Sequence, residues 1–336
     1  MKRFPKCILG VVGLLAVGLG QRAAAAPSVC YGITPLLGLN LPYSPAFINS
    51  QGMVACGDVV WQHGKRWTIH NPLHDPRYSK TEAAGINDAG MVVGTFKGVE
   101  DGAWLVGYGK VFVWQSGHVV VLPPADASDL ANPLPDGINR NGDILVRVTL
   151  QAPNPDDVVY KTYLYHAGKY QLCDTAKADV WVNSQGQFVA IDSPLSVAPL
   201  SGENQTVTGA NGAGWIIGQY QKTRNSVSVP RACVWRKRRC EDIGPRSGGA
   251  SNAAAINNRG QVVGSYGTGK MDKQEEITHA FVWQHGRMTD LNRLLAHKSG
   301  WVLYEADAIN DQGQIVCWGN KGACLLTPMP IAAKLH

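Results

Sequence analysis

The chain has 336 residues, of which 45% are hydrophobic and 17% are charged, and it contains 38 glycines and 10 tryptophans. Its formal net charge is +6, but four of the 31 basic residues and none of the 25 acidic residues lie in the first 25 positions. The rest of the chain therefore carries 27 basic against 25 acidic residues, which excludes nucleic-acid binding driven by a global positive field.

The N-terminus has the pattern of an export signal. A basic segment, residues 1–6, precedes an apolar run of about 14 residues that is too short for a comfortable membrane span. Small residues follow, and cleavage after Ala25 suits them best. We therefore expect a signal peptide over 1–25, one domain over 26–330 and a short tail over 331–336. The mature protein is expected to be a secreted or periplasmic monomer without a membrane span.

A five-residue motif, Ile-Asn-x-x-Gly, recurs along the rest of the chain. Its clear copies contain Asn49 and Gly52, Asn87 and Gly90, Asn139 and Gly142, Asn257 and Gly260, and Asn310 and Gly313. Looser copies contain Asn183 with Gly186 and Asn211 with Gly214. Asn-x-x-Gly fits a type I turn with a left-handed Gly that joins two antiparallel strands. We expect these turn residues to carry stability rather than ligand binding.

A second pattern follows each turn. It is an apolar strand that carries a Trp near its end, followed by a second turn and a further short strand. The Trp recurs at the same position of the unit, as Trp61, Trp114, Trp235 and Trp283. Each unit therefore predicts two hairpins, or four short strands. A large aromatic side chain that recurs at one strand position is expected to fill the space between neighbouring units.

The spacing of the units predicts the architecture. Successive turn asparagines lie 38, 52, 44, 28, 46 and 53 positions apart. Four-stranded propeller blades repeat every ~40–50 residues, so the sequence predicts an all-β fold, a β-propeller of seven blades or alternatively six. The short interval between Asn183 and Asn211 lacks the Trp-containing half, which predicts a degenerate unit or one that lacks a strand.

The two ends of the repeat array are expected to meet. The last unit ends near Thr327 without a fourth strand, and the segment Tyr31–Leu37 resembles the fourth strand of the preceding unit. Pairing of this segment with the last unit would close the ring and remove exposed strand edges. The alternative is an unstructured N-terminal tail.

One inserted segment concentrates residues that could bind a ligand. His70, His74, Asp75, Arg77 and Tyr78 fall within nine positions, and such a mixture suits acid–base work or binding of an anionic sugar. The alternative is an ordinary rigid loop. The chain contains no recognisable catalytic, phosphate-binding or dinucleotide-binding motif, so no catalytic residue, metal or cofactor is predicted.

The cysteines predict local disulfides. Export implies an oxidising compartment, and the pairs Cys233/Cys240 and Cys317/Cys324 each span seven positions. A turn at Asn320-Lys321 would place the second pair opposite each other, and a turn at Arg236-Lys237 would do the same for the first. Free thiols are the alternative. The partners of Cys30, Cys56 and Cys173 are not predictable from the sequence.

The segment His279 to Leu291 resembles the repeat of the HAF family of probable extracellular proteins, named for its His-Ala-Phe triplet. The Ile256 to Gly264 segment matches the other half of that repeat, and degraded copies cover most of the chain. The resemblance implies an exported bacterial protein and supplies no catalytic motif. The position of His279 at the start of a strand predicts a structural hydrogen bond for its side chain.

These features favour a binding or interaction module for an unidentified extracellular ligand, either a glycan or a protein. One alternative is a polysaccharide-active glycosidase or lyase, with acidic residues of different blades meeting at one rim of the channel. Another is a structural surface or envelope protein. Specificity is expected in the segments that differ between units, namely 70–82, 96–110, 151–160 and 266–278.

Overall fold

The computed structural model describes residues 29–39, 44–100, 103–125, 132–151, 158–173, 178–182, 188–192, 205–224, 226–236, 239–273, 275–297 and 299–330. The expected signal peptide over 1–25, the tail over 331–336 and the looser turn at Asn183 and Gly186 lie outside these residues. No helix in the described ranges is long and apolar enough to cross a membrane.

The described residues form six four-stranded antiparallel sheets and one two-stranded sheet, which confirms the all-β prediction. The first three sheets follow chain order. They comprise β2 (Ala46–Ile48), β3 (Val54–Cys56), β4 (Val59–Gln62) and β5 (Lys65–Thr68); β6 (Lys80–Ile86), β7 (Val92–Glu100), β8 (Ala103–Gln115) and β9 (His118–Val121); and β10 (Asn132–Ile138), β11 (Ile144–Gln151), β12 (Val158–His166) and β13 (Lys169–Cys173).

The remaining sheets include the short one. They comprise β14 (Ala178–Val182) and β15 (Phe188–Asp192); β16 (Gln205–Ala210), β17 (Ile216–Arg224), β18 (Val227–Arg236) and β19 (Arg239–Asp242); β20 (Ser251–Ile256), β21 (Val262–Asp272), β22 (Glu275–Gln284) and β23 (Arg287–Asp290); and β24 (Leu303–Ile309), β25 (Ile315–Gly319) and β26 (Gly322–Pro330) with β1 (Val29–Pro35). A short 3₁₀ helix, η3 (Leu291–Arg293), follows β23. The two strands β14 and β15 belong to the unit that the short asparagine spacing marks as degenerate.

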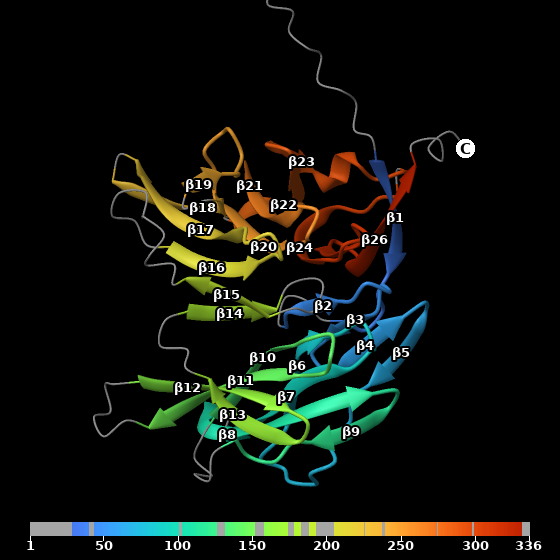
Figure 1. The fold of residues 1–336 in the computed structure, drawn as a ribbon. Coiled ribbons are helices and arrows are strands. Elements are labelled where there is room, and N and C mark those ends of the chain that lie inside the picture. The colour runs from blue at the N-terminus through green and yellow to red at the C-terminus, as the bar shows by residue number, and fades with distance from the viewer. Residues whose placement is uncertain are drawn as a thin grey trace, which may run out of the picture.

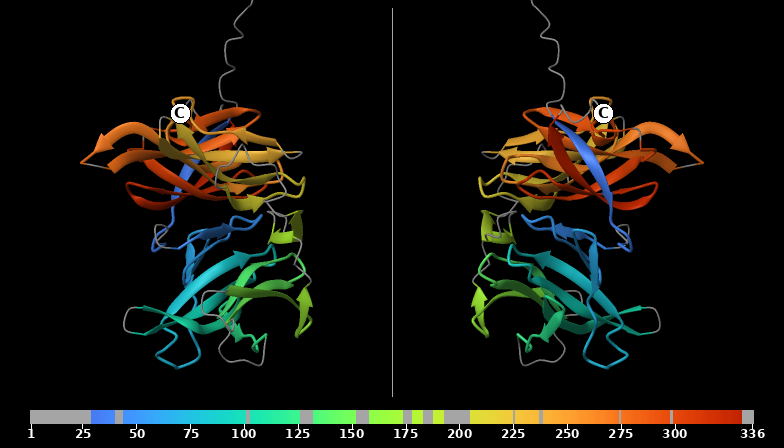
Figure 2. Two further views of the ribbon diagram at one scale, coloured as in Figure 1. Left: turned by 90° about the vertical axis from the view of Figure 1, so that its left-hand side faces the viewer. Right: turned by 90° about the vertical axis from the view of Figure 1, so that its right-hand side faces the viewer.

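The first strands of the sheets lie next to one another. β2 contacts β6, β6 contacts β10, β16 contacts β20, β20 contacts β24, and β24 contacts β2, while β14 lies between β10 and β16. Figure 1 shows the sheets from β2 to β13 in one half of the molecule and those from β16 to β26 in the other, and Figure 2 shows the same two halves from the sides. Repeated four-stranded antiparallel sheets with adjoining first strands form a β-propeller.

The N-terminal strand belongs to the last sheet. β1 pairs with β26 in antiparallel register from Val29 opposite Pro330 to Pro35 opposite Cys324, and Figure 1 shows the two strands side by side. Tyr31 also bonds through its backbone to Leu294 and Ala296, and its side chain is 1% exposed. The predicted pairing of this segment with the last unit is therefore present, and it begins two residues earlier than Tyr31.

Packing between sheets follows the repeated aromatic position. Trp61, Trp114, Trp235 and Trp283 are all at least 93% buried, with exposed fractions of 7%, 2%, 3% and 2%. Trp114 packs in one apolar cluster with Val60 and Ala55 of the preceding sheet, and Trp283 packs with Val234 of the sheet before its own. Trp61, Trp114 and Trp283 thus fill the space between sheets, as their recurrence predicts. Trp235 differs, because it packs in a cluster with Tyr220 and Cys233 of its own sheet.

The turn asparagines form hydrogen bonds of two kinds. Within each described turn the side-chain oxygen accepts from the backbone N–H group four residues later, and in all of them except the Asn310 turn it also accepts from the N–H two residues later, as for Asn49 with Gln51 and Met53. The side-chain Nδ2 then donates to the backbone oxygen of the asparagine in the next unit. These links run from Asn49 to Asn87, Asn87 to Asn139, Asn211 to Asn257, Asn257 to Asn310, and Asn310 to Asn49, at 2.9–3.1 Å.

The sequence predicts the first kind of bond and not the second. Each asparagine therefore stabilises its own turn and also attaches that turn to a neighbouring sheet, which explains why Asn49, Asn87, Asn211, Asn257 and Asn310 are at least 98% buried. Asn139 differs, because its Nδ2 donates to Asp143 of its own turn at 2.9 Å. It precedes the degenerate unit, where the series of links between described residues stops.

The turn glycines have the predicted left-handed backbone. The φ angles of Gly52, Gly90, Gly142, Gly260 and Gly313 lie between +71° and +87°. Close packing adds a second requirement at Gly260, where a Cβ would lie 2.8 Å from the Trp215 ring of the preceding unit. Any larger residue there would be strained and would also displace a neighbouring side chain.

The structure confirms one of the two predicted disulfides. Cys233 and Cys240 form a disulfide with their Cα atoms 6.0 Å apart. The predicted turn at Arg236-Lys237 is wrong, because Arg236 pairs with Arg239 and Cys233 lies opposite Asp242, so the two cysteines are diagonal neighbours. Cys317 and Cys324 are directly opposite, as a turn at Asn320-Lys321 requires.

The predicted disulfide between Cys317 and Cys324 is nevertheless absent, and both are free thiols, as are Cys30 and Cys173. A disulfide requires a specific geometry of the two side chains as well as close Cα atoms. Both thiols pack in the apolar cluster that contains Leu303 and Leu326. The correct strand register was therefore not sufficient to predict the bond.

Candidate functional site

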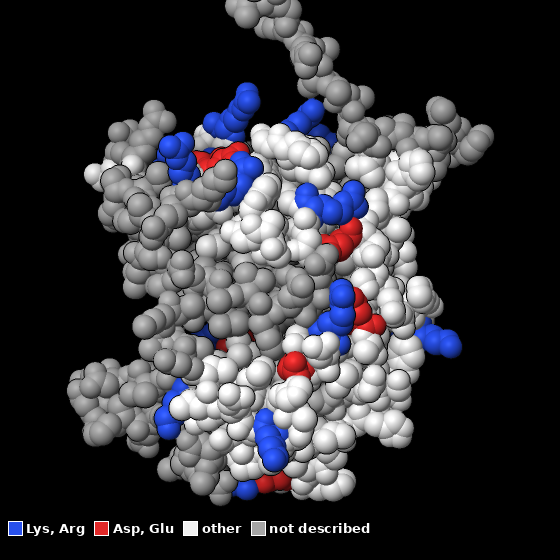
Figure 3. All heavy atoms as spheres, in the orientation of Figure 1, with Lys and Arg blue, Asp and Glu red and all other residues white. Residues whose placement is uncertain are grey.

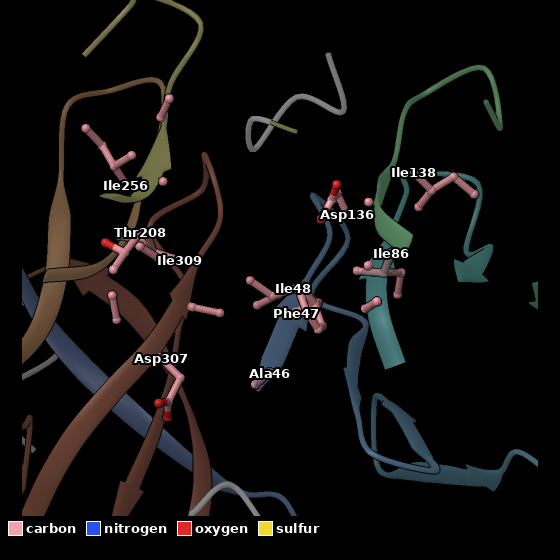
Figure 4. A pocket seen from close by; sticks show the side chains of 18 residues that line it. Ala46, Phe47, Ile48, Ile86, Asp136, Ile138, Thr208, Ile256, Asp307 and Ile309 are labelled. Atoms are coloured by element: carbon pink, nitrogen blue, oxygen red, sulfur yellow. The ribbon is translucent and has the colours of Figure 1, made fainter. Parts of the chain in front are cut away.

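A cavity of about 180 Å³ lies where the first strands of six sheets meet. Each strand contributes the three residues that directly precede the turn asparagine of its unit (Figure 4). In β16 that asparagine is Asn211 of the looser motif copy. The middle residues are Phe47, Gly85, Gly137, Gly209, Ala255 and Ala308. Small residues are needed where strands approach closely, since a Cβ on Gly85 would lie 3.2 Å from the Gly137 Cα.

Five of these strands carry a β-bulge at the same repeat position. Register shifts occur between Ala83 and Gly85 in β6 and at the corresponding places in β10, β16, β20 and β24. The extra residues are Ala84, Asp136, Thr208, Ala254 and Asp307, and all five line the cavity. A bulge redirects the side chain of its extra residue, and here the repeated bulge directs that residue toward the channel. Three of the five residues are polar.

Asp307 is the most unusual of the three. Its Oδ2 atom is buried and has no hydrogen-bond partner among the described residues. Burial, and to a smaller extent the negative charge of Glu305, raises the pKa of the Asp307 carboxyl to about 7. The group therefore changes its charge near neutral pH. A buried polar atom without a partner requires an explanation, and a ligand is one of them.

The other two polar residues are bonded within the protein. Asp136 forms an ion pair with Arg147 at 3.0 Å, and Thr208 donates its hydroxyl hydrogen to the Ala253 backbone oxygen at 2.6 Å. The Thr208 oxygen can still accept a hydrogen bond. Figure 4 shows Asp307 and Thr208 on one side of the cavity and Asp136 on the other. The wall thus combines two carboxyl groups and a hydroxyl with Ile and Ala side chains.

The loop that the sequence singles out has a different character. Asp75 forms an exposed ion pair with Arg77 at 2.7 Å, and the Arg77 hydrogen bond lowers the pKa of the Asp75 carboxyl. Tyr78 packs partly against the apolar cluster beneath the loop and donates its backbone N–H to Asp75. His70 and His74 are exposed, and His74 has a positive φ of 50°. None of the five lines the channel cavity.

The loop is thus held by contacts among its own residues. The individual residues of the channel were not predicted from the sequence. The enzyme alternative places acidic residues of different blades at one rim of the channel, but the sequence does not identify Asp136 or Asp307 among them. A usable signal exists, because both stand three positions before a turn asparagine, where Ala84 and Ala254 are apolar. Among the described residues, no group of three or more His, Cys, Asp or Glu side chains is arranged to hold a metal ion.

Comparisons with known proteins cover between about a third and nine-tenths of the chain. Residues 203–323 match a family model described as "Protein of unknown function (DUF3466)". That segment contains the last three turns, which begin at Asn211, Asn257 and Asn310, and the bulge residues Thr208, Ala254 and Asp307. None of the curated proteins matches the chain.

Three similar solved structures share little sequence with the chain. The β-propeller domain of the Trilobed protease from Pyrococcus furiosus is 10% identical, with 85% of this chain and 80% of that chain covered and a TM-score of 0.36. A gluconolactonase from Xanthomonas campestris is 12% identical, with 92% and 99% covered and a TM-score of 0.41. A protein of unknown function from Dyadobacter fermentans is 10% identical, with 90% and 96% covered and a TM-score of 0.38. Similarity of this size does not transfer an activity.

Proposed function

We propose that the protein is an exported binding module, built as a seven-bladed β-propeller whose ring is closed by β1 and whose fourth blade is reduced to β14 and β15. The ligand would insert a polar group into the channel cavity. The observation that carries this proposal is the bulge residue Asp307, a cavity-lining carboxyl with a buried oxygen that lacks a hydrogen-bond partner among the described residues. Export would follow from the N-terminal signal pattern and from the resemblance to the HAF repeats.

The cavity favours the end of a hydroxyl-rich molecule such as a glycan. Its volume of about 180 Å³ is below the ~300–1,000 Å³ of pockets that enclose a whole small ligand, so it would take a terminal group. A carboxyl with a pKa of about 7 can accept a hydrogen bond and, when protonated, donate one. Thr208 offers a further acceptor on the same side of the cavity. This combination suits a neutral group that both donates and accepts.

The distribution of charge on the surface also favours a neutral ligand. On the face shown in Figure 3, basic and acidic side chains lie close together rather than in separate patches. The ion pairs of Lys80 and Lys97 with Glu82 are examples of this mixing. A mixed surface provides little attraction for a strongly charged ligand. Binding would therefore depend on hydrogen bonds and shape.

A polysaccharide-active enzyme is the second candidate, and one observation favours it. Two carboxyl groups face the same cavity in different environments, since Asp307 has a raised pKa and Asp136 is paired with Arg147. A pair of carboxyls with different environments can divide the roles of general acid and base. In that case Asp307 would donate a proton to the leaving oxygen and Asp136 would act as the base.

A glycan array probed with the mature protein, residues 26–336, would test both candidates. Each bound glycan would then be incubated with the protein and assayed for new reducing ends and for unsaturated products. Binding without product supports the module, and product formation that is lost in Asp307→Asn supports the enzyme. Absence of binding to every glycan, together with absence of product, would contradict both.

A further inference from the structure

A groove of about 820 Å³ lies away from the channel, between the β21–β22 hairpin and the beginning of β24. Its walls include Thr268, Thr278, His279 and Glu276 from the hairpin, and Val302 and Tyr304 from the last sheet. It shares no lining residue with the channel cavity. Its volume lies within the ~300–1,000 Å³ typical of pockets that enclose a small ligand.

The hairpin segment of this groove is one of the segments in which the sequence predicts specificity. Its conformation is held by its own hydrogen bonds. The Thr268 hydroxyl donates to the Ile277 backbone oxygen at 2.8 Å, and the Gly269 N–H donates to Glu276 at 2.8 Å. The wall is therefore shaped before any ligand arrives, which reduces the entropic cost of binding.

His279, the motif histidine, lines this groove. Its Nδ1 lies 2.8 Å from Asp290 Oδ2, and the Tyr266 hydroxyl donates to the same oxygen at 3.1 Å. The other oxygen, Oδ1, accepts from the Asn292 N–H at the start of η3. Because a carboxylate oxygen only accepts, the neutral imidazole must carry its hydrogen on Nδ1. Nε2 is then the acceptor of the ring.

The preceding sheet provides an internal comparison. There Arg231 takes the place of His279, Asp242 that of Asp290 and Tyr220 that of Tyr266, and the same contacts form. Arg231 is only 3% exposed, because it also donates to the backbone oxygens of Pro245 and Gly249 in the loop that covers it. The His279 side chain is 26% exposed. The same repeat position is therefore covered in one sheet and open to a groove in the next.

We infer that the groove beside His279 is a second binding site, and that its ligand is a neutral pyranose unit of an oligosaccharide. The Tyr304 side chain would contact the apolar face of the sugar ring. The hydroxyls of the sugar would bond to His279 Nε2 and to the hydroxyls of Thr268 and Thr278. The charged groups of the groove are nearly balanced, with Lys270 and Lys273 against Asp272, Glu275 and Glu276, so a charged ligand gains little. This inference rests on the contacts of the groove and not on the proposed function of the channel.

The test uses nuclear magnetic resonance with the mature protein and neutral oligosaccharides of glucose, galactose, mannose and N-acetylglucosamine as probes. At least one probe should shift the amide signals of residues 268–279 and 302–304. Tyr304→Ala should weaken its binding by about tenfold or more. His279→Arg should weaken it similarly while leaving the melting temperature nearly unchanged, because Arg231 shows that an arginine at this repeat position bonds to the equivalent aspartate, Asp242.

Asp307→Asn serves as the control, since the channel and the groove share no lining residue. It should leave binding at the groove unchanged even if it abolishes binding at the channel. The inference is overturned if no probe shifts the groove signals, or if Tyr304→Ala and His279→Arg both bind like the wild type. A failure of channel binding alone would count only against the proposed function.

Discussion

At the scale of single residues, the turn glycines separate two physical effects. Gly214 and Gly260 have nearly equal φ angles of +73° and +71°. A Cβ on Gly214 would meet nothing within 4 Å, whereas one on Gly260 would lie 2.8 Å from Trp215. The first position therefore measures backbone strain alone, and the second measures strain together with a steric clash.

We expect Gly214→Ala to lower the free energy of unfolding by about 1 kcal/mol and Gly260→Ala to lower it by about 2–3 kcal/mol. Chemical denaturation of both variants beside the wild type would measure the difference. Equal losses would show that the Trp215 ring moves aside without cost and that its packing on the turn contributes nothing.

The Asp307 carboxyl predicts how stability depends on pH. Its pKa rises from 3.8 to about 7 on folding, so the folded state holds the proton more tightly than the unfolded state between these values. The stability that this group contributes is fully present below pH 3.8 and is lost as the pH rises toward and through 7. Asp307→Asn, which cannot ionise, should therefore show a smaller fall in melting temperature between pH 5 and pH 8 than the wild type. Parallel melting curves in the two proteins would contradict this.

The site shows what a sequence can and cannot reveal about single residues. Asn49 and Gly52 were predictable because a turn imposes its own chemistry on a few adjacent positions. Asp307 and Asp136 were not, because their significance arises from a bulge and from strands of other sheets. The cluster of charged and aromatic residues in one loop gave a stronger sequence signal. In the structure, however, Asp75 and Arg77 of that loop form hydrogen bonds with each other.

At the scale of strands, β1 is the element whose loss should matter most. It provides an outer strand for the last sheet, and Tyr31 is buried in the core with a pKa raised to about 12 by that burial. Deletion of residues 27–40 should lower the melting temperature and broaden the transition, because it exposes the edge of β26 and opens the apolar cluster around Leu326. Deletion of residues 331–336 is the control. A melting transition like that of the full mature protein would contradict the role of β1.

The cysteines give a second prediction at this scale. Peptide mapping under non-reducing conditions should recover the Cys233–Cys240 disulfide. Cys317 and Cys324 should resist alkylation in the folded protein and react after unfolding, because burial raises the pKa of both thiols, for Cys324 to about 12. Recovery of a Cys317–Cys324 disulfide would contradict the free-thiol state of this pair.

The strands themselves were largely predictable, and their exact pairing was less so. The Ile-Asn-x-x-Gly turns and the Trp positions mark both ends of each hairpin, which is why sheets such as β20–β23 follow the expected pattern. The turn after Trp235 lies one residue later in the structure than the sequence predicted. The run Arg236 to Arg239 contains neither Gly nor Asn, so no residue in it fixes the position of the turn. The repeated bulges in the first strands were not predicted, because the Gly or Ala that follows each extra residue suits bulged and regular strands alike.

At the scale of the whole molecule, stability and binding are assigned to different places. The asparagine links and turn glycines connect the sheets, whereas the polar bulge residues face the channel and the β21–β22 hairpin faces a groove. Links between neighbouring units along the array allow the loops and the channel residues to vary without disturbing the connections. This division explains how one repeat can dominate the sequence while leaving few clues to the ligand.

The most direct test of this division is the dissociation constant of the strongest glycan on the array that leaves the amide signals of residues 268–279 unshifted, measured for three versions of the mature protein. Asp307→Asn should weaken its binding by about tenfold or more, since the channel loses its ionisable acceptor. The double variant His74→Ala with Arg77→Ala, which changes an exposed loop outside the channel, should bind like the wild type. Wild-type affinity in Asp307→Asn together with weakened binding in the loop variant would contradict the account and place the site in the loop.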